Sequence, residues 1–92
     1  MIISFRHKGL KALHQRGDAS GVRADHTERL CRLLAYLEEA QTPADMALPG
    51  LRLHTLQGQR SGYWAVNVSA NWRLVFRFCG TDVELVDYLD YH

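Results

Sequence analysis

The carboxyl terminus of this chain carries three side chains that could take part in acid–base chemistry. Asp90, Tyr91 and His92 supply a carboxylate, a phenol and an imidazole, directly after an apolar run that predicts a strand over residues 83–88. An imidazole exchanges protons near neutral pH, so a strand that holds this triplet against the fold would create an acid–base site. A terminus that nothing holds would leave the same groups solvated and inactive. The residues alone leave both alternatives open.

A second imidazole lies in the middle of the chain. His54 falls in a predicted strand over residues 51–56, on the face opposite Leu53, so we expect it to be exposed or in a cleft. A single histidine in that setting is usually structural or solvated, whereas two imidazoles can serve as base and acid. Such a pair can cleave RNA by activating a 2′-hydroxyl group and protonating the departing 5′-oxygen. This chemistry requires the fold to bring His54 and His92 together.

Charge is unevenly distributed along the sequence. The net charge is only +1, which does not by itself indicate a nucleic-acid-binding protein. Between residues 51 and 78, however, every formal charge is an arginine: Arg52, Arg60, Arg73 and Arg77. We take Arg73, on an outward strand face, and Arg60, in a glycine-bounded loop, as candidate phosphate ligands. The alternative is that each forms an ordinary surface ion pair of about 1 kcal/mol or less.

Length and composition restrict the class of protein. With 92 residues, of which 47% are hydrophobic and 23% charged, the chain is expected to form one globular domain over residues 1–92. It contains no apolar stretch of about 20 residues and no apparent signal peptide, so a cytoplasmic location is expected. Cys31 and Cys79 stand outside any ligand cluster and are expected to be buried or idle thiols. No cofactor and no metal are expected.

An α+β arrangement must position these groups. The apolar run 2–5 predicts a first strand, and residues 8–16 predict a short helix that ends at Gly17. Asp25 and Glu28 have the spacing of a capping box, which predicts that a long helix follows. Its core face is formed by four residues at helical spacing: Leu30, Leu33, Leu34 and Leu37. One further turn is predicted over residues 43–46, before Pro49 and Gly50 break the chain.

The second half of the chain predicts a meander of four strands, over residues 51–56, 63–68, 72–78 and 83–88. Apolar residues alternate to one face in the two central strands: Trp64, Val66, Val68, Trp72, Leu74, Phe76 and Phe78. Arg73 and Arg77 should therefore point to the opposite face. The short connections between the last strands favour antiparallel pairing.

A set of motifs in this order resembles the HigB-type toxins of the RelE/ParE superfamily of bacterial toxin–antitoxin systems. The resemblance covers nearly the whole chain and rests on residues 3–11, 48–50, 53–54, 62–64, 71–73, 87–88 and 90–92. It implies a RelE-like α+β fold, with an N-terminal strand and two helices packed on a mainly antiparallel sheet of four to five strands. It also implies a toxin that enters the ribosomal decoding site and cleaves messenger RNA.

The resemblance further implies partners and site residues. The expected partners are a HigA-like antitoxin with a helix-turn-helix domain, the ribosome with its messenger RNA and, through the antitoxin, operator DNA. The catalytic positions of the family correspond here to His54, Asp90, Tyr91 and His92. The family commonly has lysine at position 57, where this chain has Gln57. Because an amide donates hydrogen bonds but supplies no positive charge, Arg60 and Arg73 are expected to carry more of the electrostatic role.

Two alternative functions follow from the same resemblance. A ParE-like protein would share the fold but would inhibit DNA gyrase by binding, without chemistry of its own. The two imidazoles argue against that alternative. A toxin attenuated by Gln57 would act mainly as a co-repressor together with its antitoxin.

Overall fold

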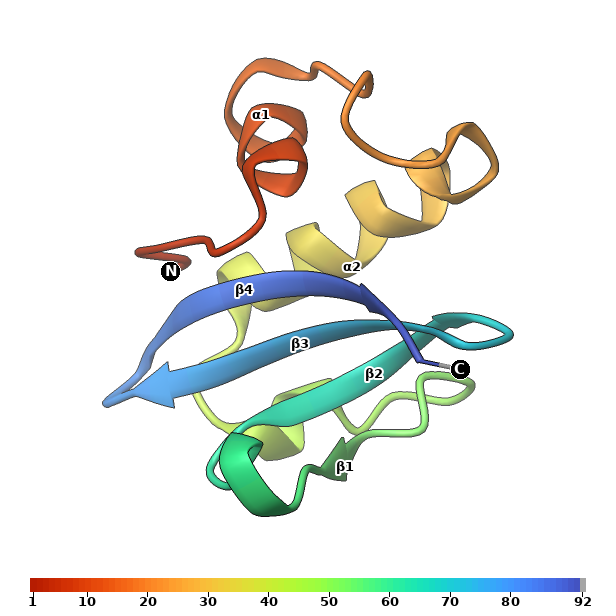
Figure 1. The fold of residues 1–92 in the computed structure, drawn as a ribbon. Helices are drawn as coiled ribbons and strands as arrows, with labels where there is room; N and C mark the ends of the chain where they lie inside the picture. The colour runs from red at the N-terminus through yellow and green to blue at the C-terminus, as the bar shows by residue number, and fades with distance from the viewer. Residues whose placement is uncertain (92) are drawn as a thin grey trace.

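The computed structural model describes residues 1–91 (Figure 1). Two α-helices, α1 (Lys8–Arg16) and α2 (Thr27–Glu39), precede the sheet in the chain. Within the described residues, four antiparallel strands follow in the spatial order β1-β2-β3-β4: His54–Thr55, Trp64–Ser69, Trp72–Cys79 and Asp82–Asp90. Short 3₁₀ turns lie at η1 (Ala24–His26), η2 (Pro43–Met46) and η3 (Gly58–Arg60). The predicted α+β class and antiparallel meander are confirmed.

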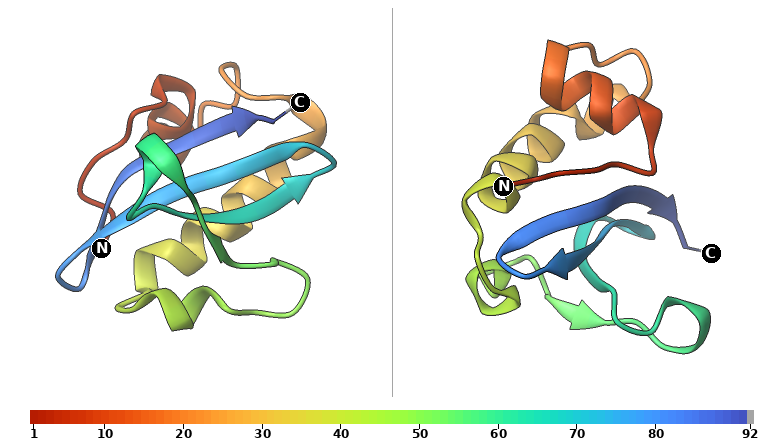
Figure 2. Two further views of the ribbon diagram at one scale, coloured as in Figure 1. Left: turned by 60° about the horizontal axis from the view of Figure 1, so that its bottom comes forward. Right: turned by 90° about the vertical axis from the view of Figure 1, so that its left-hand side faces the viewer.

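The helices cover one face of the sheet. Leu30, Leu33, Leu34 and Leu37 of α2 are buried, as their spacing predicted, and they share one core with buried residues of the central strands such as Val66, Leu74 and Phe76. Figures 1 and 2 show both helices on the same side of the sheet, while the η3 loop lies on the other side. The face opposite the helices is called the open face below. Within residues 1–91, neither helix has the length and apolar character needed to cross a membrane.

The end of α1 agrees with the prediction from the sequence, whereas the start of α2 differs from it. Gly17 ends α1 in the left-handed conformation, with φ of 70°, where a residue without Cβ meets little strain. The predicted capping box of Asp25 and Glu28 is wrong. Asp25 instead accepts two hydrogen bonds from Arg23, and α2 begins after His26 without a side-chain cap. The local ion pair competes for the carboxylate that the cap would have used.

The predicted N-terminal strand is reduced to two isolated parallel bridges with β4. Ile2 pairs with Val83 and Phe5 with Val86. Glu38 of α2 holds the start of this segment, because its carboxylate accepts a hydrogen bond from the Ile2 N–H at 3.0 Å. The segment therefore extends the sheet beyond β4 without forming a full ladder.

The two central strands lie within one residue of their predicted bounds, whereas the first and last strands of the meander differ by more. The first meander strand covers only residues 54–55 instead of 51–56, because Arg52 has φ of 55° and interrupts the extended backbone. The last strand is longer than predicted and includes Asp90. It also contains a bulge: between the pairs Val75–Asp87 and Arg77–Glu84, β4 has one residue more than β3. Leu85 lies in this bulge with φ of 56°.

Cys31 and Cys79 are free thiols. Both are exposed, so of the two alternatives predicted for them, buried or idle, burial does not apply. Neither contributes to the site described next.

Candidate functional site

A row of four paired residues crosses the open face of the sheet. His54 pairs with Ala65, Ala65 with Val75, and Val75 with Asp87. Directly opposed residues on antiparallel strands project to the same face, so His54 and Asp87 lie at the two ends of one row. Three strand spacings separate them, which corresponds to roughly 14 Å between their Cα atoms. Ala65 and Val75, which lie between the two polar ends, are apolar and fully buried.

Arg73 lies on the same face in the neighbouring row. It pairs with Asn67 on one side and Leu89 on the other, as predicted for an outward-facing arginine. Its Nη1 donates hydrogen bonds to the carbonyl groups of Ala70 at 2.7 Å and Trp72 at 3.0 Å. No ion pair of Arg73 occurs within residues 1–91. The guanidinium is therefore oriented by backbone groups and keeps its charge available for an anion.

Arg77, the other outward arginine of β3, is already neutralised. Its Nε and Nη2 donate to one carboxylate oxygen of Glu84 at 2.8 and 2.6 Å, and its guanidinium lies 5.5 Å from the centre of the Tyr63 ring. The hydrogen bonds to Glu84 raise the pKa of Arg77. The two arginines thus share a face, and of the two only Arg77 forms an ion pair within residues 1–91.

Gln57 and Arg60 lie in the loop that contains η3. Gln57 precedes the turn and is exposed, while Arg60 ends it and is half-buried. Nη1 of Arg60 is buried and has no hydrogen-bond partner among the described residues. In the right-hand view of Figure 2, this loop and the carboxyl-terminal end of β4 both project from the side of the sheet that faces away from α2. The loop therefore flanks the open face.

The carboxyl-terminal tail is held through residue 91. Asp90 forms the last residue pair of β3 and β4, opposite Trp72. The Tyr91 N–H then donates a hydrogen bond to the Asn71 carbonyl at 2.8 Å, in the turn that joins β2 to β3. The alternative of an unattached tail therefore does not apply to Asp90 and Tyr91. His92 lies outside the described residues.

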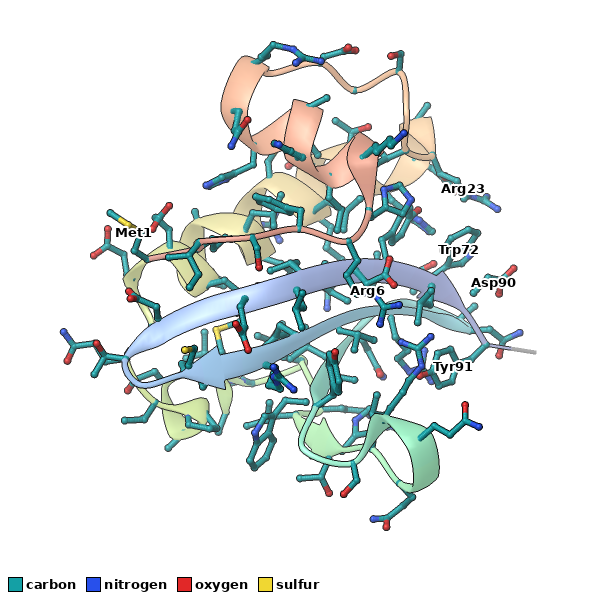
Figure 3. The ribbon with its side chains drawn as sticks, turned by 60° about the vertical axis from the view of Figure 1, so that its left-hand side comes forward. Met1, Arg6, Arg23, Trp72, Asp90 and Tyr91 are labelled. Atoms are coloured by element: carbon teal, nitrogen blue, oxygen red, sulfur yellow. The ribbon has the colours of Figure 1, made fainter. Side chains whose placement is uncertain are left out.

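Asp90 and Tyr91 project to opposite sides of the sheet (Figure 3). Asp90 shares the helix side with Trp72, whose ring lies 5.8 Å from the Arg23 guanidinium. Hydrogen bonds from Arg23 to Asp25 raise the pKa of Arg23, and the charge of Asp90 adds to this effect. Tyr91 lies on the other side and is exposed. His54 belongs to the open face, so Asp90 and His54 lie on opposite faces of the sheet.

The prediction missed His26, which is buried with 3% of its surface exposed. Its Nδ1 lies 2.5 Å from the Tyr88 hydroxyl, and its Nε2 lies 2.8 Å from the Ser69 hydroxyl. Burial raises the pKa of Tyr88, and Trp72 stacks on the Tyr88 ring at 4.6 Å. His26 sits in a segment without periodicity, so no local pattern in the sequence indicated this contact.

The fold and the open face together define a small α+β domain with an exposed imidazole and an oriented guanidinium on one face of its sheet. Residues 3–92 match the family model of the RelE-like toxin of type II toxin–antitoxin system HigB. The chain therefore belongs to the HigB-like toxin family, and the family predicted from the motifs is confirmed. As a toxin of a type II system, it has an antitoxin partner.

Two curated relatives share the full length of the chain. It is 41% identical over 92 residues to "Endoribonuclease HigB" of Proteus vulgaris, with 100% of both chains covered. It is 30% identical over 94 residues to "Toxin HigB-1" of Vibrio cholerae serotype O1, strain ATCC 39315 / El Tor Inaba N16961, with 100% of this chain and 98% of the relative covered.

Proposed function

We propose that this protein is an endoribonuclease that cleaves messenger RNA on the ribosome and is neutralised by a HigA-like helix-turn-helix antitoxin. The observation that carries the proposal is that His54 and Arg73 share the open face of a HigB-family fold. An imidazole can move protons near neutral pH, and a guanidinium can bind and stabilise a phosphate. The full-length similarity to "Endoribonuclease HigB" supports the same reaction class.

The proposed reaction is an internal transfer at phosphorus. One imidazole, of His54 or His92, removes the proton of a ribose 2′-hydroxyl group, and the resulting oxygen forms a bond to the adjacent phosphorus. The bond from phosphorus to the 5′-oxygen then breaks, and that oxygen takes a proton from the other imidazole or from water. The products are a 2′,3′-cyclic phosphate and a 5′-hydroxyl group. Because imidazoles supply both proton transfers, the scheme requires no metal ion.

Charge builds up on the phosphate oxygens during this transfer. Arg73 is proposed to stabilise it, since its guanidinium is oriented by two backbone carbonyl groups and forms no ion pair within residues 1–91. Arg60 and Gln57 are proposed to contribute from the η3 loop, Arg60 by charge and Gln57 by hydrogen bonding. Tyr91 is proposed to position the nucleotide by stacking, for which its exposed ring on the side away from Asp90 is suitable.

The reaction is tested by replacing His54. The variant His54→Gln keeps hydrogen bonding but removes the basic imidazole, so cleavage of messenger RNA on translating ribosomes and growth arrest should both fall by about a hundredfold or more. Gln59→Ala, in the exposed η3 loop, serves as the matched control and should keep full toxicity. Undiminished cleavage by a folded His54→Gln protein would remove this residue from the mechanism. Inhibition of gyrase supercoiling without cleavage of messenger RNA would instead support the ParE-like alternative.

The antitoxin complex provides a second role for the protein. We propose that the complex with the HigA-like antitoxin represses its own operon, with the antitoxin contacting operator DNA. The presence of Gln57 favours some attenuation of the toxin, because position 57 carries no positive charge. A mobility-shift experiment with operator DNA, antitoxin alone and the complex tests this role. Equal affinity of the antitoxin with and without the toxin would contradict it.

A further inference from the structure

His54 is exposed, but one of its ring nitrogens has a fixed partner. Nδ1 lies 2.7 Å from the backbone carbonyl oxygen of Arg52. A carbonyl oxygen can only accept a hydrogen bond, so the neutral imidazole must carry its proton on Nδ1 to make this contact. Nε2 is then the nitrogen with a free lone pair, and no hydrogen bond to it is found within residues 1–91. The contact therefore selects one of the two neutral tautomers.

An unusual backbone conformation presents the Arg52 carbonyl to the ring. Arg52 has φ of 55°, in the left-handed region that residues with a side chain rarely adopt. The neighbouring residues restrict the segment on both sides. Leu51 is buried and its carbonyl accepts a hydrogen bond from the Asn67 N–H at 2.8 Å, and His54 starts the ladder opposite Ala65. Arg52 lies between these two anchors, where the backbone changes direction.

The Arg52 side chain does not explain this conformation. Its guanidinium is exposed and forms no ion pair or hydrogen bond within residues 1–91. Glycine or asparagine would adopt the left-handed backbone at lower cost, so arginine is not the residue that the turn alone would favour. The contribution of Arg52 to His54 is made by the main chain.

We propose that Arg52 is a positioning residue whose carbonyl fixes the tautomer of His54, so that Nε2 of His54 is the base that removes the proton of the 2′-hydroxyl group. The inference rests on the proposed endoribonuclease function and assigns the role that the sequence left open between the two histidines. When Nε2 takes the proton, the ring becomes an imidazolium, and the hydrogen bond from Nδ1 to the carbonyl becomes charge-assisted. The contact is therefore stronger after proton transfer than before it, and it favours His54 as the proton acceptor.

The tautomer can be measured without any activity assay. In the full-length protein labelled with ¹⁵N at histidine, the ring nitrogens of a neutral imidazole report directly which of them carries the proton. We expect the neutral imidazole of His54 to show the proton on Nδ1. A wild-type spectrum with the proton on Nε2, or with rapid exchange between both tautomers, would overturn the proposal.

Three variants of Arg52 separate the backbone from the side chain. Arg52→Gly, Arg52→Asn and Arg52→Val all lose the guanidinium, but only valine strongly disfavours the left-handed conformation. The glycine and asparagine variants should keep the Nδ1–H tautomer and a cleavage rate within about threefold of the wild type, whereas the valine variant should lose the tautomer and about tenfold or more in kcat with little change in KM. A folded valine variant that loses the tautomer but cleaves normally would contradict the proposal.

The experiment also gives a clear answer if the valine variant does not fold or if the glycine and asparagine variants lose the tautomer. If the valine variant does not fold, as judged by thermal unfolding, the wild-type, glycine and asparagine spectra still determine whether the Arg52 backbone fixes the ring. Loss of the tautomer in the glycine and asparagine variants would show that the guanidinium is required and would overturn the proposal. A protein with the expected tautomer that never cleaves RNA would instead disprove the proposed function and, with it, the role of Nε2 as base. The spectra and the cleavage assay therefore fail independently.

Discussion

The Nδ1 atom of His26 lies 2.5 Å from the hydroxyl oxygen of Tyr88, although 62 residues separate them in the chain. This contact joins the start of α2 to the final part of β4. Through its other nitrogen, His26 also contacts Ser69 at 2.8 Å, close to the turn whose Asn71 carbonyl holds the Tyr91 N–H. His26 therefore links the start of α2 to β4 through Tyr88 and to the end of β2 through Ser69. Both contacts lie close to the tail that carries the predicted catalytic residues.

The first prediction concerns this buried contact. Tyr88→Phe removes the hydroxyl and leaves Nδ1 of the buried His26 without its partner, so the free energy of unfolding should fall by about 1–3 kcal/mol. Urea denaturation measures the change. Tyr36→Phe is the matched control, because Tyr36 is 40% exposed on α2 and should lose almost nothing. Equal losses in both variants would show that the contact with His26 does not stabilise the fold.

The second prediction separates the two outward arginines of β3. Arg73→Gln should lower kcat for messenger RNA cleavage by about a hundredfold, because an oriented positive charge near the phosphate is lost. Arg77→Gln should change it by less than about threefold, since Glu84 already neutralises that guanidinium. Single-turnover cleavage on programmed ribosomes measures both. A larger effect at Arg77 than at Arg73 would show that phosphate binding had been assigned to the wrong arginine.

The third prediction concerns Gln57, which stands where the HigB-type family commonly has lysine. Gln57 is exposed before η3, so Gln57→Lys should add a mobile positive charge next to the open face without disturbing the fold. We expect cleavage to rise by about tenfold if this amide attenuates the toxin, since one charge contact of about 1.4 kcal/mol in the transition state gives that factor. Gln59→Lys, two residues further on in the same turn, controls for a general gain in RNA affinity. Equal gains from both substitutions would argue against a specific role for position 57.

The fourth prediction is a pH dependence of stability. Asp45 accepts hydrogen bonds from the N–H groups of Gln41 and Thr42 at 2.9 and 3.2 Å, and these bonds lower the pKa of its carboxyl group. A carboxyl whose pKa is depressed by folding stabilises the protein above its unfolded pKa of about 3.9, and this stabilisation disappears as pH falls through the folded pKa. Asp45→Asn should therefore lower Tm at pH 7, and the difference from wild type should shrink as the pH falls below the unfolded pKa of about 3.9. A difference in Tm that stays constant with pH would exclude this charge effect.

Local patterns in the sequence were sufficient to locate the main helices and strands and to identify the family. Helical spacing of four leucines located α2 and its buried face, and alternation along the central strands located the core face of β2 and β3. Both signals are local, because a helix or strand repeats its pattern within a few residues. Gly17 marked the end of α1 by another local signal, since glycine readily adopts the left-handed conformation that ends a helix. The HigB-like family was likewise identified by the order of motifs along the chain.

The sides of the sheet on which the candidate residues lie became clear only from the folded chain. Counting by strict alternation from Glu84, which shares its face with Arg77, would put Asp90 on the open face. The bulge at Leu85 inserts one residue and reverses this result, so that Asp90 joins Trp72 on the helix side and Tyr91 projects away from it. The side-chain hydrogen bonds of Arg77 with Glu84, of Arg23 with Asp25 and of His26 with Tyr88 likewise could not be predicted from local sequence patterns. Register, bulges and side-chain partners depend on contacts between distant residues or on competition among neighbours, and neither periodicity nor motif spacing encodes them.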